Sequence, residues 1–170
     1  MIDKIIEKYD VTADDVTAKI EIRYTSKDFV PTYNLITPKI EKGTLALLDK
    51  VKEGLITQIP IKSAEVIDLT LLATLKQKLH EAGFKMLKRE LPTMKDDILK
   101  YFTSTIMHDM LGLGKFELML ADGNLEDINI NNSGEQVWVY HKKYGWLKSN
   151  IKIGNENEII NLASSIGRKI

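Results

Sequence analysis

The segment Gly112-Leu-Gly-Lys115 combines two glycines with a lysine, residue types that bind phosphate in several nucleotide-binding loops. A Walker A loop also needs a glycine six residues before its lysine and a serine or threonine after it. Asp109 and Phe116 occupy those two positions. The dinucleotide-binding fingerprint fails as well, because its third glycine would fall at Glu117. We therefore predict that the first glycine ends a helix in the left-handed conformation and that the second redirects the chain.

Three carboxylates follow this segment, at Asp122, Glu126 and Asp127. They lack the alternating Asp and Asn spacing and the twelfth-position glutamate of a calcium-binding loop. Because Asp, Gly and Asn are common in turns, we predict a solvated turn here.

The three histidines, His80, His108 and His141, have no second histidine or carboxylate at ligand spacing, and the chain has no cysteine. Sulfur-based zinc sites, disulfides and thiolate nucleophiles are therefore excluded. No serine lies in a Gly-x-Ser-x-Gly elbow. The sequence thus predicts no metal ligand and no catalytic residue.

Two groups of side chains have the composition of a binding surface. Lys85, Lys88 and Arg89 suit the carbonyl end of a helix, and a docking surface is the alternative. Four aromatic residues adjoin two lysines between positions 138 and 146, an arrangement that can stack on single-stranded nucleic acid. Aromatic pairs are also favoured across hairpins, and we prefer this packing interpretation.

The composition describes a folded chain without a strong electrostatic preference. Of 170 residues 44% are hydrophobic, and 24 basic residues balance 24 acidic ones. A chain of this length buries roughly 70% of its unfolded surface on folding. It contains no run of about 18 apolar residues and no apolar signal core, so we expect a cytoplasmic protein in a reducing compartment.

The first two thirds of the chain predict a short helix, a strand pair and three amphipathic helices. A short helix is expected up to Tyr9, with capping-box spacing at residues 12–15, followed by an edge hairpin of strands over 18–24 and 29–36. Amphipathic helices are expected from Thr37-Pro38 to about residue 55, from about Ser63 to Arg89, and from a capping box at residues 93–96 to Met110.

The last third changes to the period of two that is typical of strands. Strands are expected over 127–132, 137–141 and 146–153, forming a small antiparallel sheet. Residues 155–158 cap a final helix that stays amphipathic to Ile170 without a stop signal, so we expect the polypeptide to continue. The predicted class is α+β, with a strand pair and helical bundle over 1–111 and a sheet subdomain over 112–170.

Three strings, Leu111–Asn131, Val137–Trp146 and Ile166–Lys169, resemble the N-terminal region of archaeal secretion ATPases. These enzymes belong to the type II/type IV secretion superfamily, which powers pilus assembly, archaellum assembly and protein export. The resemblance is strong over residues 95–170 and rests on the order of strands and helices before that.

The resemblance implies a regulatory and assembly region of a homo-hexameric motor. Its sheet would be PAS-like, and ATP with Mg²⁺ would bind between this region and a C-terminal RecA-like domain that carries the catalytic motifs. Arg168 would lie near the nucleotide. The implied partners are the chain's own ATPase domain, the neighbouring subunits and a membrane platform protein, with no nucleic acid. No Walker A or Walker B string occurs in these residues, so the region alone is not expected to be an enzyme.

A free-standing PAS-like sensor of small molecules, or a protein-interaction module, is the alternative function. A sensor would need a cavity of about 300 Å³ or more at the inner face of the strands around Val137 and Val139.

Overall fold

A computed structural model describes residues 4–24, 26, 29–59, 69–111 and 113–167 of the chain. Their contacts divide them into two compact units. The sheet unit comprises residues 4–13, 17–38 and 115–163, and the helical unit comprises residues 14–16, 39–114 and 164–167. One unit is built on a sheet and the other on helices, so the predicted α+β class is confirmed.

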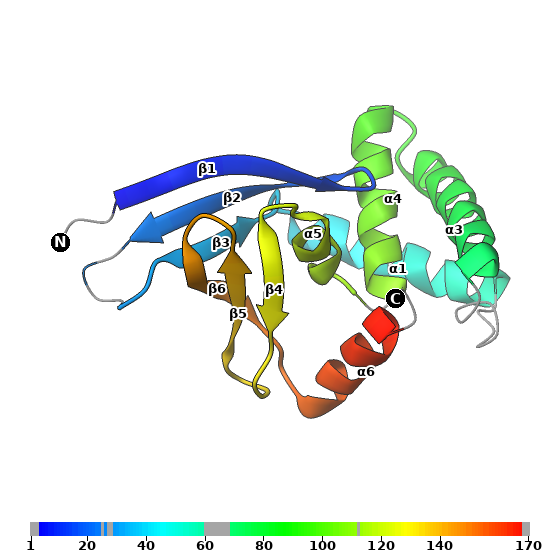
Figure 1. Ribbon diagram of the computed structural model, residues 1–170. Helices are drawn as coiled ribbons and strands as arrows, with labels where there is room; N and C mark the ends of the chain where they lie inside the picture. The colour runs from blue at the N-terminus through cyan, green and yellow to red at the C-terminus, as the bar shows by residue number, and fades with distance from the viewer. Residues whose placement is uncertain (1–3, 25, 27–28, 60–68, 112, 168–170) are drawn as a thin grey trace. The chain divides into compact units, whose positions relative to one another are not determined.

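Six strands form one sheet in the order β1-β2-β3-β6-β5-β4 (Figure 1). They span Lys4–Ala13 (β1), Val16–Tyr24 (β2), Thr32–Ile36 (β3), Leu125–Asn129 (β4), Gln136–His141 (β5) and Gly145–Lys152 (β6). The pairs β2–β3, β5–β6 and β4–β5 are antiparallel, as the hairpin signals predict. The pair β3–β6 is parallel, and it makes the sheet mixed.

The parallel pair joins strands that are more than a hundred residues apart in sequence. Thr32 and Tyr33 lie opposite Lys148 and Ser149. Beyond them the side-chain amide of Asn150 continues the ladder: its oxygen accepts from the Leu35 amide at 2.9 Å, and its nitrogen donates to the Leu35 carbonyl at 3.0 Å. The N-terminal strands thus belong to the sheet, whereas the predicted division places them with the helices in residues 1–111.

The short helix expected up to Tyr9 is wrong, because these residues form β1. Residues 12–15 do not cap a helix either. Thr12 and Ala13 end β1, and Asp14 and Asp15 form the tight turn to β2, in which Asp14 has φ of 51°, a conformation that Asp and Asn tolerate better than most residues. An isolated strand and a short helix differ little in sequence, and pairing with β2 decides between them.

The sheet buries one face through alternating side chains. Ile20, Ile22, Tyr33, Val139 and Leu147 are completely buried. This alternation is the signal from which the sequence predicts β2, β3, β5 and β6, and those predictions are confirmed.

The described part of the helical unit contains α1 (Lys42–Gln58), α3 (Leu69–Glu90) and α4 (Asp96–Met110). Helix α1 begins at Lys42 instead of at Thr37-Pro38, and Glu41 at its N-cap makes no side-chain capping hydrogen bond. Helix α4 begins at Asp96, after Lys95, so the predicted capping box at residues 93–96 is also wrong. The predicted start near Ser63 lies outside the described residues.

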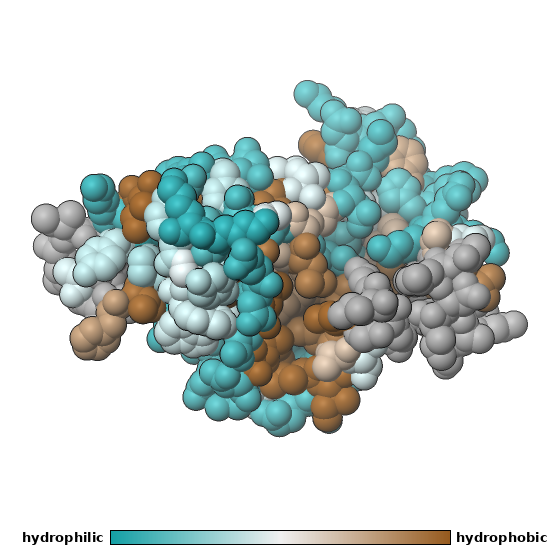
Figure 2. All heavy atoms as spheres, in the orientation of Figure 1, coloured by the Kyte–Doolittle hydropathy of each residue, from teal (hydrophilic) through white to brown (hydrophobic). Residues whose placement is uncertain are grey.

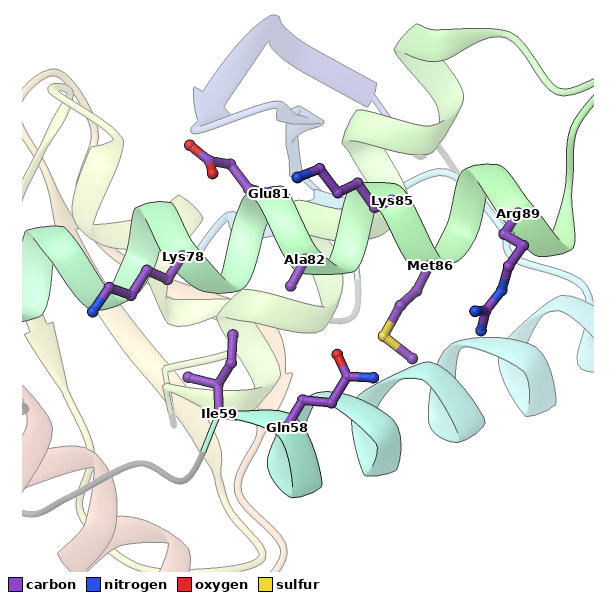
Figure 3. Close-up of a pocket in the computed structure, with 8 residues that line it drawn as sticks. All are labelled: Gln58, Ile59, Lys78, Glu81, Ala82, Lys85, Met86 and Arg89. Carbon is purple, nitrogen blue, oxygen red and sulfur yellow. The ribbon is translucent and has the colours of Figure 1, made fainter.

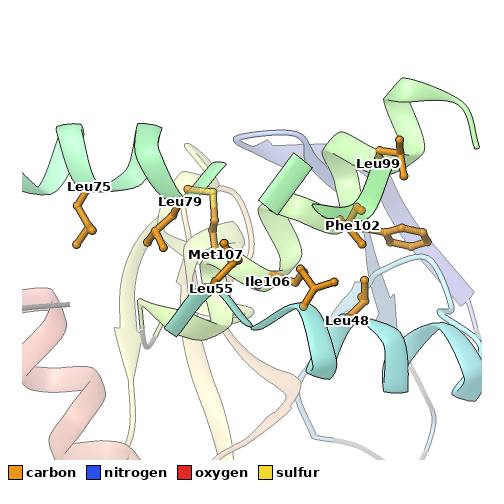
Figure 4. Close-up of a cluster of buried hydrophobic side chains, with 10 residues drawn as sticks. Leu48, Leu55, Leu75, Leu79, Leu99, Phe102, Ile106 and Met107 are labelled. Carbon is orange, nitrogen blue, oxygen red and sulfur yellow. The ribbon is translucent and has the colours of Figure 1, made fainter. Parts of the chain in front are cut away.

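The helices pack around a core of leucines and larger apolar residues (Figure 4). Leu55, Leu79, Leu87 and Leu99 are completely buried in it. Gly83 of α3 allows close packing, since a Cβ there would lie 3.2 Å from the Thr103 methyl group and 3.4 Å from Leu55. The buried face of α4 includes Leu99, whereas the neighbouring Ile98 is 37% exposed.

Two shorter helices adjoin the last strands. Helix α5 (Phe116–Ala121) precedes β4 and packs against β1 in the sheet unit. Helix α6 (Glu156–Gly167) begins with the predicted capping box: the Glu158 amide donates to Asn155 Oδ1 at 3.0 Å, and Asn155 Nδ2 donates to Glu158 Oε1 at 2.8 Å. Hydrophobic residues reach the surface over α6 (Figure 2), where Ile160 is 60% exposed.

The glycine segment after α4 closes that helix. The amides of Leu113 and Gly114 both donate to the carbonyl oxygen of His108, at 3.3 and 2.9 Å. Gly114 has φ of +49°, which agrees with the predicted change of chain direction. Gly112 lies outside the described residues, so its predicted left-handed conformation stays a prediction.

Replacing Gly114 tests this conformation. Gly114→Ala is expected to lower the free energy of unfolding of the helical unit by about 1 kcal/mol, because an L residue is strained in the left-handed region. Gly43→Ala in α1 is the control: nothing lies within 4 Å of a Cβ there, and alanine should raise the free energy of unfolding by about 0.5 kcal/mol. Urea denaturation followed by circular dichroism at 222 nm measures both, and equal effects would contradict the assignment.

Candidate functional site

A buried carboxylate lies where α5 ends in the sheet unit. Asp122 is only 3% exposed, so the predicted solvated turn is wrong at this residue. Its Oδ2 accepts hydrogen bonds from the hydroxyl groups of Tyr9 at 2.8 Å and Tyr33 at 2.9 Å. Its Oδ1 accepts from the Asn124 amide at 2.9 Å. Glu126 and Asp127, the other two carboxylates of this segment of the sequence, are exposed as predicted.

The donors come from distant strands of the sheet. Tyr9 lies on the edge strand β1, and Tyr33 lies on β3 in the middle of the sheet. Asp122 lies three residues before β4, which is the opposite edge strand. The sheet is therefore curled so that a residue of its first strand reaches the loop before its last strand. We call Asp122, Tyr9, Tyr33 and His141 the carboxylate cluster.

The electrostatics of the carboxylate cluster keep both tyrosines protonated. Burial raises the pKa of Tyr33, and the charge of Asp122 raises it further. Burial and the hydrogen bond to Asp122 also raise the pKa of Tyr9. Both hydroxyls thus stay donors over the whole physiological range. The carboxylate is engaged by three protein donors, which suits a structural link between strands better than a general base.

His141 closes the carboxylate cluster at the end of β5. It is 3% exposed, and its ring lies 6.2 Å from that of Tyr9. The Lys143 amide donates to Nδ1 at 3.1 Å, so the proton of the neutral ring is on Nε2. Nε2 is buried without a hydrogen-bond partner in the part of the chain that the structure describes. Burial lowers the pKa of His141, and the charge of Asp122 opposes this shift only in part.

The turn after His141 binds the loop after Asp122. The Lys142 amide donates to the Asn124 carbonyl at 2.9 Å, and Lys142 Nζ donates to the Gly123 carbonyl at 2.6 Å. Lys143 Nζ lies 3.3 Å from Glu7 Oε2 and 5.0 Å from the centroid of the Tyr144 ring. Both lysines of the aromatic segment are therefore bound to groups of this chain.

The aromatic residues of β5 and β6 pack across the hairpin. Tyr140 lies opposite Trp146, and their rings meet edge to face at 5.3 Å. The packing interpretation is confirmed for this pair. Val137, Val139 and Leu147 on the other face are at most 1% exposed, so side chains fill the place where a sensor would need a cavity.

The phosphate-loop interpretation of residues 112–115 has no structural support. The amides of Leu113 and Gly114 would have to point at a ligand, yet both donate to the end of α4. The described residues include no group of three or more His, Asp or Glu side chains that could hold a metal ion. His108, which sequence spacing left without a partner, lies with Nε2 2.8 Å from Asp14 Oδ2. Arg168 lies outside the described residues.

No sequence motif identifies the carboxylate cluster. In the sequence, Asp122 is 89 residues from Tyr33 and 113 residues from Tyr9. The Asp-Gly-Asn order at 122–124 signals a turn, but only the curled sheet brings the tyrosines to it.

No protein-family model matches the chain. The chain is 31% identical over 157 residues to the uncharacterized protein MJ1288 of Methanocaldococcus jannaschii, an alignment that covers 90% of this chain and 61% of that protein. It is 25% identical over 166 residues to the uncharacterized protein MJ0781 of the same organism, which covers 98% of this chain and 21% of that protein. The chain thus spans about three fifths of one relative and about one fifth of the other.

Removing the charge of Asp122 should destabilise the sheet unit. We expect Asp122→Asn to lower its free energy of unfolding by about 2 kcal/mol, because hydrogen bonds to a charged acceptor contribute about 1.5–3 kcal/mol each. The fluorescence of Trp138 and Trp146, both in the sheet unit, follows urea unfolding. Asp127→Asn, at an exposed carboxylate, is the matched control and should change little. Equal stability of both variants would contradict the role of the carboxylate cluster.

The buried imidazole predicts a pH dependence. Because the pKa of His141 is lowered from 6.5 in the folded chain, the unfolded chain binds more protons. The free energy of unfolding should therefore fall as the pH decreases below about 6.5, and level off below the folded pKa. His141→Asn keeps an acceptor for the Lys143 amide and should flatten this dependence. An NMR titration of the ring measures the pKa directly, and a value of 6.5 or higher would contradict the prediction.

Proposed function

We propose that this chain is the N-terminal regulatory and assembly region of a hexameric secretion ATPase of the pilus, archaellum or protein-export type. The region itself is not catalytic. ATP and Mg²⁺ would bind between this region and a RecA-like domain that carries the catalytic motifs, because the described residues that come nearest to a phosphate loop have their amides bound to His108.

The observation that carries the proposal is the way in which the two longest resembling strings fold together. Residues 111–131 provide α5 and β4, and residues 137–146 provide most of β5 and the start of β6. They meet in the hydrogen bonds from Lys142 to Gly123 and Asn124, beside the carboxylate cluster. The parts of these two strings that lie in the sheet unit thus adjoin one another.

The relatives support a role as one part of a longer protein. In MJ0781 the aligned residues make up 21% of the length, so four fifths of that protein lie outside the alignment. The hydrophobic surface over α6, with its exposed Ile160, supports association with further polypeptide (Figure 2).

In the proposed protein the sheet unit would act as a rigid support. Its single sheet and the carboxylate cluster resist internal deformation, so nucleotide-dependent motion of a neighbouring domain would move it as a body. The helical unit would then present this motion to neighbouring subunits and to a membrane platform protein on the cytoplasmic side. In the described part of the chain, each helix is too short or too polar to cross a bilayer.

The proposal is tested on the protein that the complete gene encodes. We expect that protein to hydrolyse ATP in a coupled assay and the 170-residue chain to show neither turnover nor a change in thermal unfolding with Mg-ATP. Turnover by the chain alone, or a gene without a nucleotide-binding module, would contradict the proposal.

A further inference from the structure

A groove of about 550 Å³ lies within the helical unit, between the end of α1 and the face of α3 that carries Ala82 and Met86 (Figure 3). Its floor is apolar. Ala82 and Met86 point from α3 toward α1, and Ile59 points back toward α3. These three side chains are partly buried and pack against the core of the helical unit. An occupant of the groove would therefore cover an apolar strip that rests on a fixed support.

The rim of the groove is positively charged. It carries Lys78, Lys85 and Arg89 and one carboxylate, Glu81. Among the ion pairs of the described residues, none includes Lys78 or Lys85, and the contact of Arg89 with Glu90 is long at 4.0 Å. Arg89 is 74% exposed at its side chain. The charges of the rim are thus available to an anionic partner.

From the sequence, the basic residues expected at this end of the helix are Lys85, Lys88 and Arg89. In the structure Lys88 Nζ instead lies 2.7 Å from Asp96 Oδ1, and Lys88 does not line the groove. Lys78, two turns before Lys85 on α3, takes its place. Lys78 and Lys85 are seven residues apart, so helical periodicity places them on the same face of α3.

The spacing of the rim charges selects an extended occupant. Lys78 and Arg89 lie at the two ends of the apolar strip (Figure 3). Eleven residues separate them, which corresponds to about 16 Å along the helix axis. A single small anion cannot contact both ends. An amphipathic helix of three turns matches this length, places apolar side chains on the strip and can carry carboxylates at both ends.

We propose that this groove binds an acidic amphipathic helix of a partner protein. Carboxylates near the two ends of that helix would pair with Lys78 and Arg89, and its apolar face would cover Ile59, Ala82 and Met86. Glu81 disfavours a continuous row of phosphates along this rim and therefore favours a protein partner over a nucleic acid. The inference rests on the groove alone and holds whether or not the chain belongs to a secretion motor.

A designed peptide tests the proposal on the intact chain. The probe is a labelled 15-residue helix with leucines on one face and glutamates beside them, and a second peptide carries lysines in place of the glutamates. Fluorescence anisotropy should detect binding of the acidic peptide only, and the affinity should fall as salt is raised. NMR signals of the Met86 methyl group should shift on binding, because this side chain lies in the floor.

Charge reversal at the rim provides the decisive comparison. Lys78→Glu with Arg89→Glu should weaken binding of the acidic peptide by at least about tenfold. Lys95→Glu with Lys100→Glu makes the same change of net charge at two exposed lysines outside the groove and should leave the affinity within about twofold. Circular dichroism checks that both variants are folded.

Three results would overturn the proposal. They are the absence of binding by the acidic peptide, equal weakening in both charge-reversal variants, and tighter binding of a 12-nucleotide oligo-dT at the same rim residues. The last result would assign the groove to nucleic acid.

Discussion

The structure of the sheet unit depends on the carboxylate of Asp122, which accepts hydrogen bonds from strands that the sequence keeps far apart. A curled six-stranded sheet has two free edges, and here Tyr9 of the first strand reaches the loop before the last one. A buried carboxylate is costly without donors, so the two phenol groups and one backbone amide are needed to hold it in place. The same link fixes the end of α5 and the loop that leads to β4.

The two units divide the requirements of the proposed function between them. The sheet unit gains rigidity from its six-stranded hydrogen-bond ladder and from the hydrogen bonds of its buried carboxylate. The helical unit is built on leucine packing and leaves one apolar strip uncovered between α1 and α3. A rigid body and a docking surface are what a regulatory region needs when catalysis takes place on other polypeptide, and neither requires a catalytic residue in this chain.

Predictions from the sequence succeeded where a local pattern is sufficient. Strands β5 and β6, the capping box of α6 and the cross-strand packing of Tyr140 with Trp146 follow from spacing over a few residues. They failed where a local pattern has competing outcomes. The Thr-Pro start was displaced to Lys42, because strand β3 is paired with β2 as far as Ile36, directly before Thr37, and a cap contributes only about 1 kcal/mol. The first residues became an edge strand for the same reason.

The sequence by itself determined the α+β composition, the amphipathic faces and the absence of a complete nucleotide-binding motif, because each depends on residue types at short spacing. Only the tertiary structure decided that the N-terminal and C-terminal strands share one sheet, that Asp122 is buried beneath two tyrosines, and that Lys78 replaces Lys88 at the groove. These features depend on contacts between residues widely separated in sequence or on which side of a helix faces a neighbour. The free energies of side-chain burial and strand pairing decide these contacts, and they cannot be read from a short stretch of sequence.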